Sequence, residues 1–242
     1  DHPLLPLRVV TDRTRGAAYL ALGITGMAMF GIFLFLTYYL DGVLGFSAIQ
    51  TGTGFLPMIT VLVIGATVSG SILLPRLGPR TLVPIGALIA AAGLVILTRL
   101  DTSSTYVGGV LPGLIIIGLG LGIIFGPIQN AATAGVSARE SGVASAMVNT
   151  AQQVCGSIGT AVLSSLYASA VSNYATAHQG NGVAHTKAAI TELALRASVS
   201  GYQVVFWVSA LAMLLAGLLA AILFRSGPLP ERDKDAAPVL AH

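Results

Sequence analysis

The side chains of this sequence that could do chemistry are crowded into the middle of one apolar stretch. The run SGVASAMVNTAQQVCGSIGTAVLSS holds two glutamines, Gln152 and Gln153, shortly after an asparagine. An amide left in hydrocarbon without a hydrogen bond costs roughly 2 kcal/mol or more, so these side chains must face protein or water. Helical spacing places four residues of the run on one face: Ser145, Asn149, Gln152 and Gly156. We expect this face, with Gln153 beside it, to be a helix contact, the wall of a substrate cavity, or both.

A second polar pair, Gln129 and Asn130, follows the glycine-rich run GLGLGIIFGP. Pro127 is expected to break the helix just before this pair, because proline has no N–H to donate. A broken helix end beside polar side chains would form the floor of a substrate cavity. A simple helix stop at the membrane interface is the alternative.

The first apolar stretch is the aromatic one, with Phe30, Phe33, Phe35, Tyr38 and Tyr39. Tyrosine near the end of a membrane span is typically an interfacial anchor. The other interpretation is that Phe33 and Tyr38 line an apolar pocket for a hydrophobic ligand. Asp41 follows at the outer boundary, where water solvates a carboxylate.

The remaining reactive residue types predict neither an enzyme nor a metal site. A single cysteine, Cys155, lies in an apolar stretch and is expected to pack there. His178 and His185 are seven residues apart, which is not the spacing of a helical zinc pair. No Asp, Glu or His lies in the middle of an apolar stretch, where a membrane proton relay needs one.

Composition decides which elements hold these residues. The 242 residues are 55% hydrophobic and 9% charged, against about 25% charged in soluble domains. So few charges cannot cover a soluble globule, and the composition indicates an integral membrane protein. The net charge of +3 is small and is explained by membrane topology, so no nucleic-acid partner is expected.

Six charge-free stretches are long enough to cross a bilayer, which takes about 20 apolar residues in a helix. They are residues 17–40, 50–74, 81–97, 107–128, 142–167 and 204–224. Residues 169–200 are too polar for hydrocarbon and are predicted to form an outer loop, and residues 227–242 a disordered cytoplasmic tail. The sequence therefore predicts an all-α integral membrane protein with six transmembrane helices.

The distribution of basic residues predicts the orientation. With an even number of spans, both ends of the chain lie on the same side of the membrane. That side would carry nine basic residues: Arg8, Arg13, Arg15, Arg76, Arg80, Arg139, Arg225, Arg232 and Lys234. The other side would carry three: Arg99, Lys187 and Arg196. Because cytoplasmic loops are rich in Lys and Arg, both ends are predicted to be cytoplasmic.

Small residues predict where helices pack closely. Gly118, Gly122 and Gly126 recur every four residues and form one smooth stripe in the fourth span. In the fifth span Ser145, Gly156 and Gly159 form a second stripe of small residues. We expect a neighbouring helix backbone against each of these stripes.

Four passages resemble the major facilitator superfamily, and specifically the C-terminal half of fourteen-span drug:proton antiporters of the EmrB/QacA type. They are PLLPLRVVTDRTRGAAYL, FLFLTYYLDGVLGFSAIQTGTGFLPM, SILLPRLGPRTL and GPIQNAATAGVSARESGVASAMVNTAQQVCGSIGTAV. The third is similar to the superfamily's cytoplasmic loop motif, with Arg76, Gly78 and Arg80 matching. Pro75 stands where the strong form of the motif has an acidic residue. The resemblance covers about residues 3 to 226.

The resemblance implies that residues 1–226 are the C-terminal six-helix bundle of a major facilitator fold. Spans one and four would then line the cavity, spans two and five would meet the other half, and spans three and six would face lipid. The implied partners are a missing N-terminal half of six to eight spans, the lipid bilayer and a small hydrophobic substrate. The energy source would be the proton gradient of the cell inner (plasma) membrane, with no cofactor.

Two functional hypotheses follow. In the first, the chain is half of a proton-coupled exporter of hydrophobic or cationic drug-like compounds that works by alternating access. In the second, it is a free-standing six-span interaction module or dimer without transport of its own. A channel would need a continuous polar pore face, and only the fifth span offers one.

Overall fold

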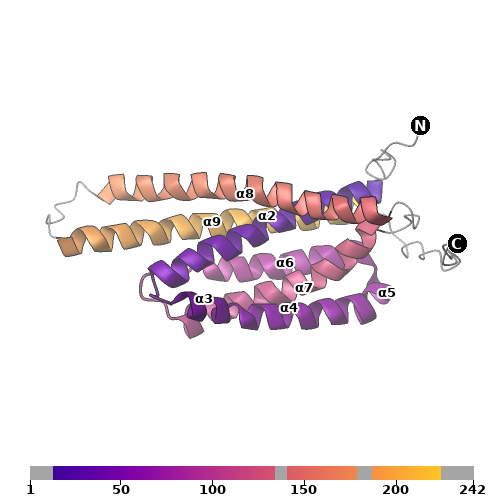
Figure 1. Ribbon diagram of the computed structural model, residues 1–242, viewed down its shortest axis with the longest axis horizontal. Helices are drawn as coiled ribbons and strands as arrows, with labels where there is room; N and C mark the ends of the chain where they lie inside the picture. The colour runs from indigo at the N-terminus through magenta and orange to yellow at the C-terminus, as the bar shows by residue number, and fades with distance from the viewer. Residues whose placement is uncertain (1–12, 134–140, 179–186, 225–242) are drawn as a thin grey trace, which may run out of the picture.

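The computed structural model describes residues 13–133, 141–178 and 187–224, and every regular element in these ranges is helical (Figure 1). The first span is α2 (Arg13–Gly42). The second is built from α3 (Ala48–Gly54), α4 (Leu56–Val68), the π-helical turn η1 (Ser69–Leu73) and α5 (Leu74–Leu77). There follow α6 (Pro79–Leu97), η2 (Tyr106–Val110) with α7 (Leu111–Thr133), α8 (Ser141–His178) and α9 (Lys187–Leu223).

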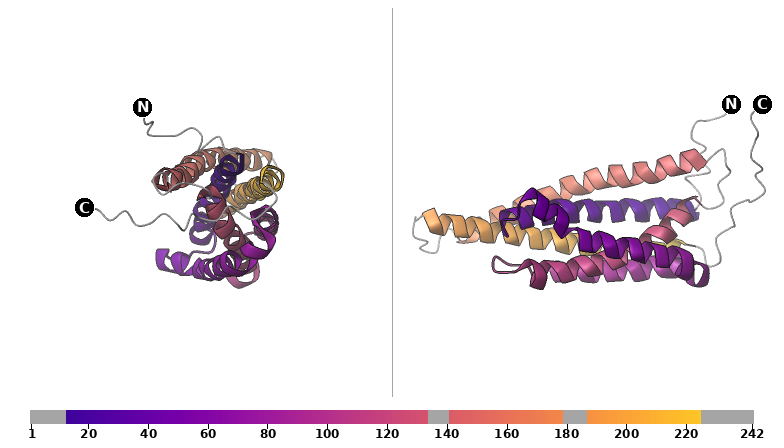
Figure 2. Two further views of the ribbon diagram at one scale, coloured as in Figure 1. Left: turned by 90° about the vertical axis from the view of Figure 1, so that its right-hand side faces the viewer. Right: turned by 60° about the horizontal axis from the view of Figure 1, so that its bottom comes forward.

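Six of these helical segments are long and apolar enough to cross a membrane, so the prediction of a six-span all-α bundle is confirmed. The predicted outer loop over residues 169–200 is wrong. The fifth helix continues to His178 and the last one begins at Lys187, so both project beyond the other helices (Figure 1 and Figure 2). A helix of 38 residues is about 57 Å long at 1.5 Å per residue, against a hydrocarbon core of about 30 Å. Polarity keeps these turns out of hydrocarbon, but it does not stop them from being helical.

The helices form two groups that interleave along the chain. In one group α2 packs against α8 and α9, and in the other α7 packs against α4 and α6. Contact between α6 and α9 joins the groups. The first span is thus a neighbour of the last two spans, and the fourth span is a neighbour of the second and third.

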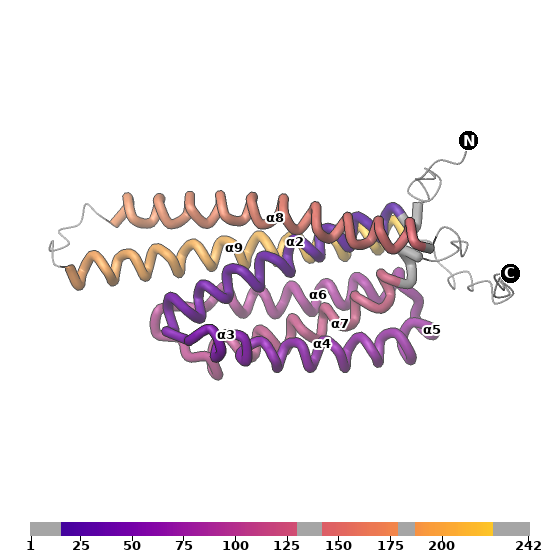
Figure 3. The backbone as a smooth tube through the Cα atoms, viewed as in Figure 1, coloured from indigo at the N-terminus to yellow at the C-terminus, as the bar shows by residue number. Residues whose placement is uncertain are grey.

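The first span begins at the end of the bundle where the last span ends (Figure 3). There the Nε–H of Arg80, in the first turn of α6, donates a hydrogen bond of 3.1 Å to the carbonyl of Ala221 in the last turn of α9. A cation at a helix C-terminus interacts favourably with the unpaired carbonyls there. Arg80 therefore fastens the start of α6 to the end of α9.

Glycines on two faces of α7 let it lie between α4 and α6 at close range. A Cβ added at Gly122 would lie 2.5 Å from the carbonyl oxygen of Leu62 in α4. One added at Gly120, on the other side, would lie 2.6 Å from the carbonyl oxygen of Gly86 in α6. Gly118 shares the face of Gly122. Any side chain at these positions would push the helix backbones apart.

The predicted break at Pro127 is wrong, because α7 runs through this residue to Thr133. Pro127 has no N–H for the carbonyl of Ile123, four residues earlier. The hydroxyl of Ser69, which is fully buried in the neighbouring span, donates a hydrogen bond of 2.9 Å to that carbonyl. A membrane helix tolerates proline where a neighbour bonds the freed carbonyl in this way.

Replacing Gly122 with alanine is expected to destabilise the bundle by about 1–3 kcal/mol, because the new methyl group overlaps the backbone of α4. Gly70→Ala is the matched control, since a Cβ at Gly70 meets nothing within 4 Å. The measurement is thermal unfolding of the detergent-solubilised protein. Equal unfolding temperatures for the two variants would contradict the role given to Gly122.

Ser69→Ala is expected to lower the free energy of unfolding by about 1–2 kcal/mol, because it leaves the Ile123 carbonyl without its donor. The control is Ser71→Ala, whose exposed hydroxyl bonds only the Thr67 carbonyl of its own helix. The same unfolding measurement separates the two. A loss as large in Ser71→Ala would show that the hydroxyl of Ser69 does not support α7.

Candidate transport surface

Two of the six spans have few neighbours. In an apolar stretch of 18 residues, 17% of the residues are buried both in the span containing α4 and in α8, against 44% to 56% in the other four spans. In Figure 1 α8 lies along the upper edge of the bundle and α4 along the lower edge. These two helices carry the open faces of the molecule.

The exposed face of α8 divides into two sides. The polar side carries Asn149, Thr150, Gln153, Ser157 and Ser164, all exposed. The apolar side carries Val154, Ile158 and Val162, which are 50%, 60% and 45% exposed. Helical spacing separates the centres of the two sides by roughly a third of a turn. Only the apolar side is suited to lipid.

The amides on the polar side have no partner in the described part of the chain. No hydrogen bond joins the side chain of Asn149 or Gln153 to any residue there, whereas the hydroxyl of Ser157 donates 2.8 Å to the carbonyl of Gln153 in its own helix. The hydroxyl of Ser157 is thus satisfied within its own helix, but these amides still require a partner or water. The amide pair is what makes this side unsuited to lipid.

The exposed face of the second span carries a stripe of hydroxyls that the sequence analysis missed. Thr53, Thr60 and Thr67 recur every seven residues, and Ser71 continues the stripe. Each hydroxyl donates to a carbonyl of its own helix, at 2.6 to 3.0 Å. The seven-residue spacing of these threonines is visible in the sequence, and it could have predicted a polar stripe on one face of this helix.

The four residues predicted to share one face of the fifth span are divided by the structure. Gly156 lies against α2, where an added Cβ would come within 2.8 Å of the ring of Phe30. Gln152 is half-buried at the same contact. Asn149 and Ser145 are both exposed on α8, and packing of Ser145 against another helix stays a prediction. Ala144 and Val148 in the same turns are buried, so the contact side of α8 lies one position round the helix from Ser145 and Asn149.

Gly126 and Gly159 lie at contacts of the kind expected from their spacing. A Cβ at Gly126 would lie 3.4 Å from the Cα of Gly70 in η1, and one at Gly159 would overlap Met27 in α2. The stripe of Gly118, Gly122 and Gly126 in α7 therefore faces the second span, and Gly156 and Gly159 of α8 face the first.

The other residues predicted to line a cavity lie apart from one another. The ring of Phe33 packs against Phe55, with 5.0 Å between ring centroids. Tyr38 is 50% exposed near the far end of α2. Gln129 is half-buried in the last turns of α7, and of Asn130 only the backbone is described. The ring contacts that the structure describes for Phe33 and Tyr38 do not include Asn149 or Gln153.

One interpretation of the sequence expected Tyr39 to be an interfacial anchor, and this is wrong. Tyr39 is fully buried, and its hydroxyl donates 2.7 Å to the backbone carbonyl of Asp101 in the loop after α6. The ring of Tyr39 packs edge-on against the ring of Tyr202 in α9, with 5.9 Å between centroids. The ring of Tyr167 in α8 also packs against Tyr202, with 5.1 Å between centroids. This cluster ties α2, α8 and α9 to the α6–α7 loop.

The loop motif turns at Gly78, whose φ of 71° is a conformation that favours glycine. Arg76 is exposed in α5, while Arg80 bonds α9 as described above. Part of the motif thus serves contacts inside this bundle.

The described carboxylates lie at the ends of the helices. They are Asp41, Asp101 and Glu192. Hydrogen bonds from the hydroxyl and the N–H of Ser103 hold the pKa of the Asp101 carboxyl below its usual range. Among the residues that the structure describes, no three His, Cys, Asp or Glu side chains lie close enough together to hold a metal ion.

The six apolar helices and their open polar faces define a multi-pass membrane protein of the transporter class. The chain belongs to the major facilitator superfamily, whose model matches residues 2–160. This family consists of transporters and not of enzymes, so the chain is classed with transport proteins.

Several named relatives are resistance or export proteins. The chain is 41% identical over 228 residues to the puromycin resistance protein of Streptomyces alboniger. This alignment covers 93% of the chain and 44% of the relative. The chain is 35% identical over 162 residues to a cephamycin export protein of Amycolatopsis lactamdurans, covering 66% of the chain and 33% of the relative. It is 32% identical over 170 residues to a tetracenomycin C resistance and export protein of Streptomyces glaucescens, covering 70% and 31%. The chain thus spans less than half the length of these relatives.

Tyr39→Phe is expected to destabilise the protein by about 1–2 kcal/mol, because it removes the hydrogen bond from the buried Tyr39 side chain to the backbone carbonyl of Asp101. Tyr38→Phe is the matched control: it removes the same atom from an exposed ring whose hydroxyl has no partner in the described chain. Thermal unfolding in detergent compares the two. If Tyr38→Phe destabilises as much, the Tyr39 hydrogen bond is not what holds the loop.

Proposed function

We propose that this chain is the C-terminal half of an exporter that moves hydrophobic or cationic drug-like compounds across the cell inner membrane. The observation that carries the proposal is the polar side of α8, an uncovered amide surface on a membrane helix of a major facilitator protein. Relatives named for puromycin resistance and for cephamycin export support the choice of substrate class.

The need to cover Asn149 and Gln153 supports a second half. Each amide without a partner in hydrocarbon costs roughly 2 kcal/mol or more, and this chain supplies no partner in its described part. The open faces of α8 and of the second span would therefore lie against the N-terminal half of six to eight spans. The fraction of each relative that this chain covers, 44% for the puromycin resistance protein, is consistent with such a half.

Alternating access gives this surface a role in the mechanism. Two halves that rock against each other need a contact that can open at either side, with the substrate between them. Hydroxyls that bond only their own helix, such as those of Thr60 and Thr67, lose no partner when the halves separate. Asn149 and Gln153 keep free donors and acceptors for a substrate or water.

Proton coupling forms part of the proposal, with the proton gradient as the energy source. A coupling residue must bind and release a proton within the membrane. Because the described carboxylates lie at helix ends, the coupling group is assigned to the other half. The excess of basic residues beside the start of α2 supports a cytoplasmic position for both ends of this chain.

Gln153→Leu is expected to lower drug export at least tenfold while membrane expression stays within twofold of the wild type, because it removes a free amide and keeps the side-chain size. The matched control is Val154→Leu, a substitution on the neighbouring apolar side of α8. The measurement is accumulation of puromycin and of ethidium in cells that carry the full-length gene as their only exporter.

Unchanged export in both Gln153→Leu and Asn149→Leu would assign the polar side to packing alone. If the full-length gene changes the accumulation of no compound in a broad panel, the exporter proposal fails. A free-standing module would then be indicated, in which a second copy covers the same faces.

A further inference from the structure

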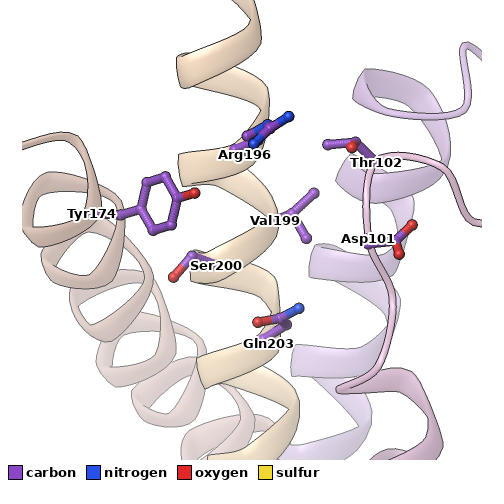
Figure 4. Close-up of a pocket in the computed structure, with 7 residues that line it drawn as sticks. All are labelled: Asp101, Thr102, Tyr174, Arg196, Val199, Ser200 and Gln203. Carbon is purple, nitrogen blue, oxygen red and sulfur yellow. The ribbon is translucent and has the colours of Figure 1, made fainter. Parts of the chain in front are cut away.

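A polar cavity of about 340 Å³ lies at the end of the bundle opposite Arg80 (Figure 4). One face of α9 forms its floor with Arg196, Val199, Ser200 and Gln203. Tyr174 extends over it from α8, and Asp101 and Thr102 of the α6–α7 loop close the other side. The cavity lies outside the open faces of α4 and α8, so the proposed transport function does not use it.

The cavity offers hydrogen-bond donors that the described chain leaves available. The hydroxyls of Thr102, Tyr174 and Ser200 have no hydrogen bond within the described residues. The guanidinium of Arg196 uses one of its five N–H groups in a 2.6 Å pair with Glu192, and both side chains of this pair are more than half exposed. Exposed pairs of this kind contribute little to stability, so Arg196 can bind a further anion without losing a strong partner.

The two nearby carboxylates do not block such an anion. Glu192 lies one turn beyond Arg196, outside the residues that line the cavity. The carboxylate of Asp101 is held by Ser103 and Ser104, and in Figure 4 it points away from α9. Arg196 itself extends toward Thr102, so a charged donor and a hydroxyl converge on one place.

The same face of α9 continues from the cavity into an exposed apolar stripe. Its members are Trp207, Leu211, Leu214 and Leu218, which are 50%, 60%, 39% and 56% exposed. They follow Gln203 at steps of three and four residues, so they lie in line below it. Trp207 is one turn, or about 6 Å, from Gln203, near the start of the apolar stretch 204–224, and tryptophan is enriched at membrane interfaces.

We propose that this cavity binds the phosphate headgroup of one phospholipid, whose acyl chain lies along the Trp207 stripe. The phosphate takes charge-assisted hydrogen bonds from Arg196 and hydroxyl hydrogen bonds from Thr102 and Ser200. One helix face carries a polar pocket with a cation, then a tryptophan, then an aliphatic stripe. In that order they match the headgroup, the interfacial region and the acyl chain of a lipid. A soluble phosphate would use only the first of them.

Native mass spectrometry of the full-length protein in detergent tests the proposal, with phosphatidylglycerol and phosphatidylethanolamine as lipids and glycerol phosphate as the soluble anion. We expect one lipid to be retained, and Arg196→Gln to weaken its retention about tenfold. Arg99→Gln is the matched control, because Arg99 is an exposed arginine at the same end that does not line the cavity. That control should change retention less than twofold.

Fluorescence gives a second measurement, because Trp207 is the single tryptophan of these 242 residues. With tryptophans elsewhere in the full-length protein replaced by phenylalanine, a phospholipid brominated on its acyl chains at low mole fraction should quench Trp207 at least twofold more than random mixing predicts. Arg196→Gln should return the quenching to the random value. Ser200→Leu, which fills the cavity and keeps the charge, should do the same.

Three results would overturn the lipid site. One is retention and quenching that Arg196→Gln leaves unchanged in a variant that unfolds at the wild-type temperature. A second is an equal loss in Arg99→Gln, which would indicate general attraction to positive charge. The third is binding of glycerol phosphate as tight as that of the lipids, which would make the cavity a site for a soluble anion.

Discussion

Close approach of helix backbones along α7 is the constraint on which the rest of the bundle depends. With no water in the hydrocarbon, each carbonyl must be bonded inside the protein, and helices gain little from burying apolar side chains that lipid solvates equally well. Gly120 and Gly122 let α7 touch α6 and α4 through their backbones. That distance lets the hydroxyl of Ser69 reach the carbonyl of Ile123, so that α7 passes through Pro127 as one helix.

The interleaved arrangement follows from the two sets of contacts. α7 binds α4 and α6, α2 binds α8 and α9, and the contact between α6 and α9 closes the bundle. Each group then leaves one helix at the edge, α4 in the first and α8 in the second. The hydroxyl stripe lies on the second span and the polar side on α8. The surface that is open to a partner is therefore a result of how the central helices pack.

The two ends of the bundle are built by different chemistry. At one end Arg80 bonds the last turn of α9, which is an electrostatic contact with helix carbonyls. At the other end the ring of Tyr202 packs against those of Tyr39 and Tyr167, and the hydroxyl of Tyr39 bonds the α6–α7 loop. Because this cluster fixes the loop beside α9, it also shapes the cavity of Arg196 and Asp101. Close packing at this end thus positions a polar site beside the start of the apolar part of α9.

The sequence by itself determined the membrane class, the number of spans and the glycines of α7, because hydrophobic length and four-residue spacing are local properties. It also pointed to Asn149 and Gln153 as side chains that lipid cannot accept. Tertiary structure alone decided that Gln152 meets α2 while Asn149 stays open, that Tyr39 is buried, and that helix continues through Pro127 and beyond residue 167. Each of these depends on a neighbour far away in the chain, such as the hydroxyl of Ser69 or the carbonyl of Asp101, and no local pattern encodes such a contact.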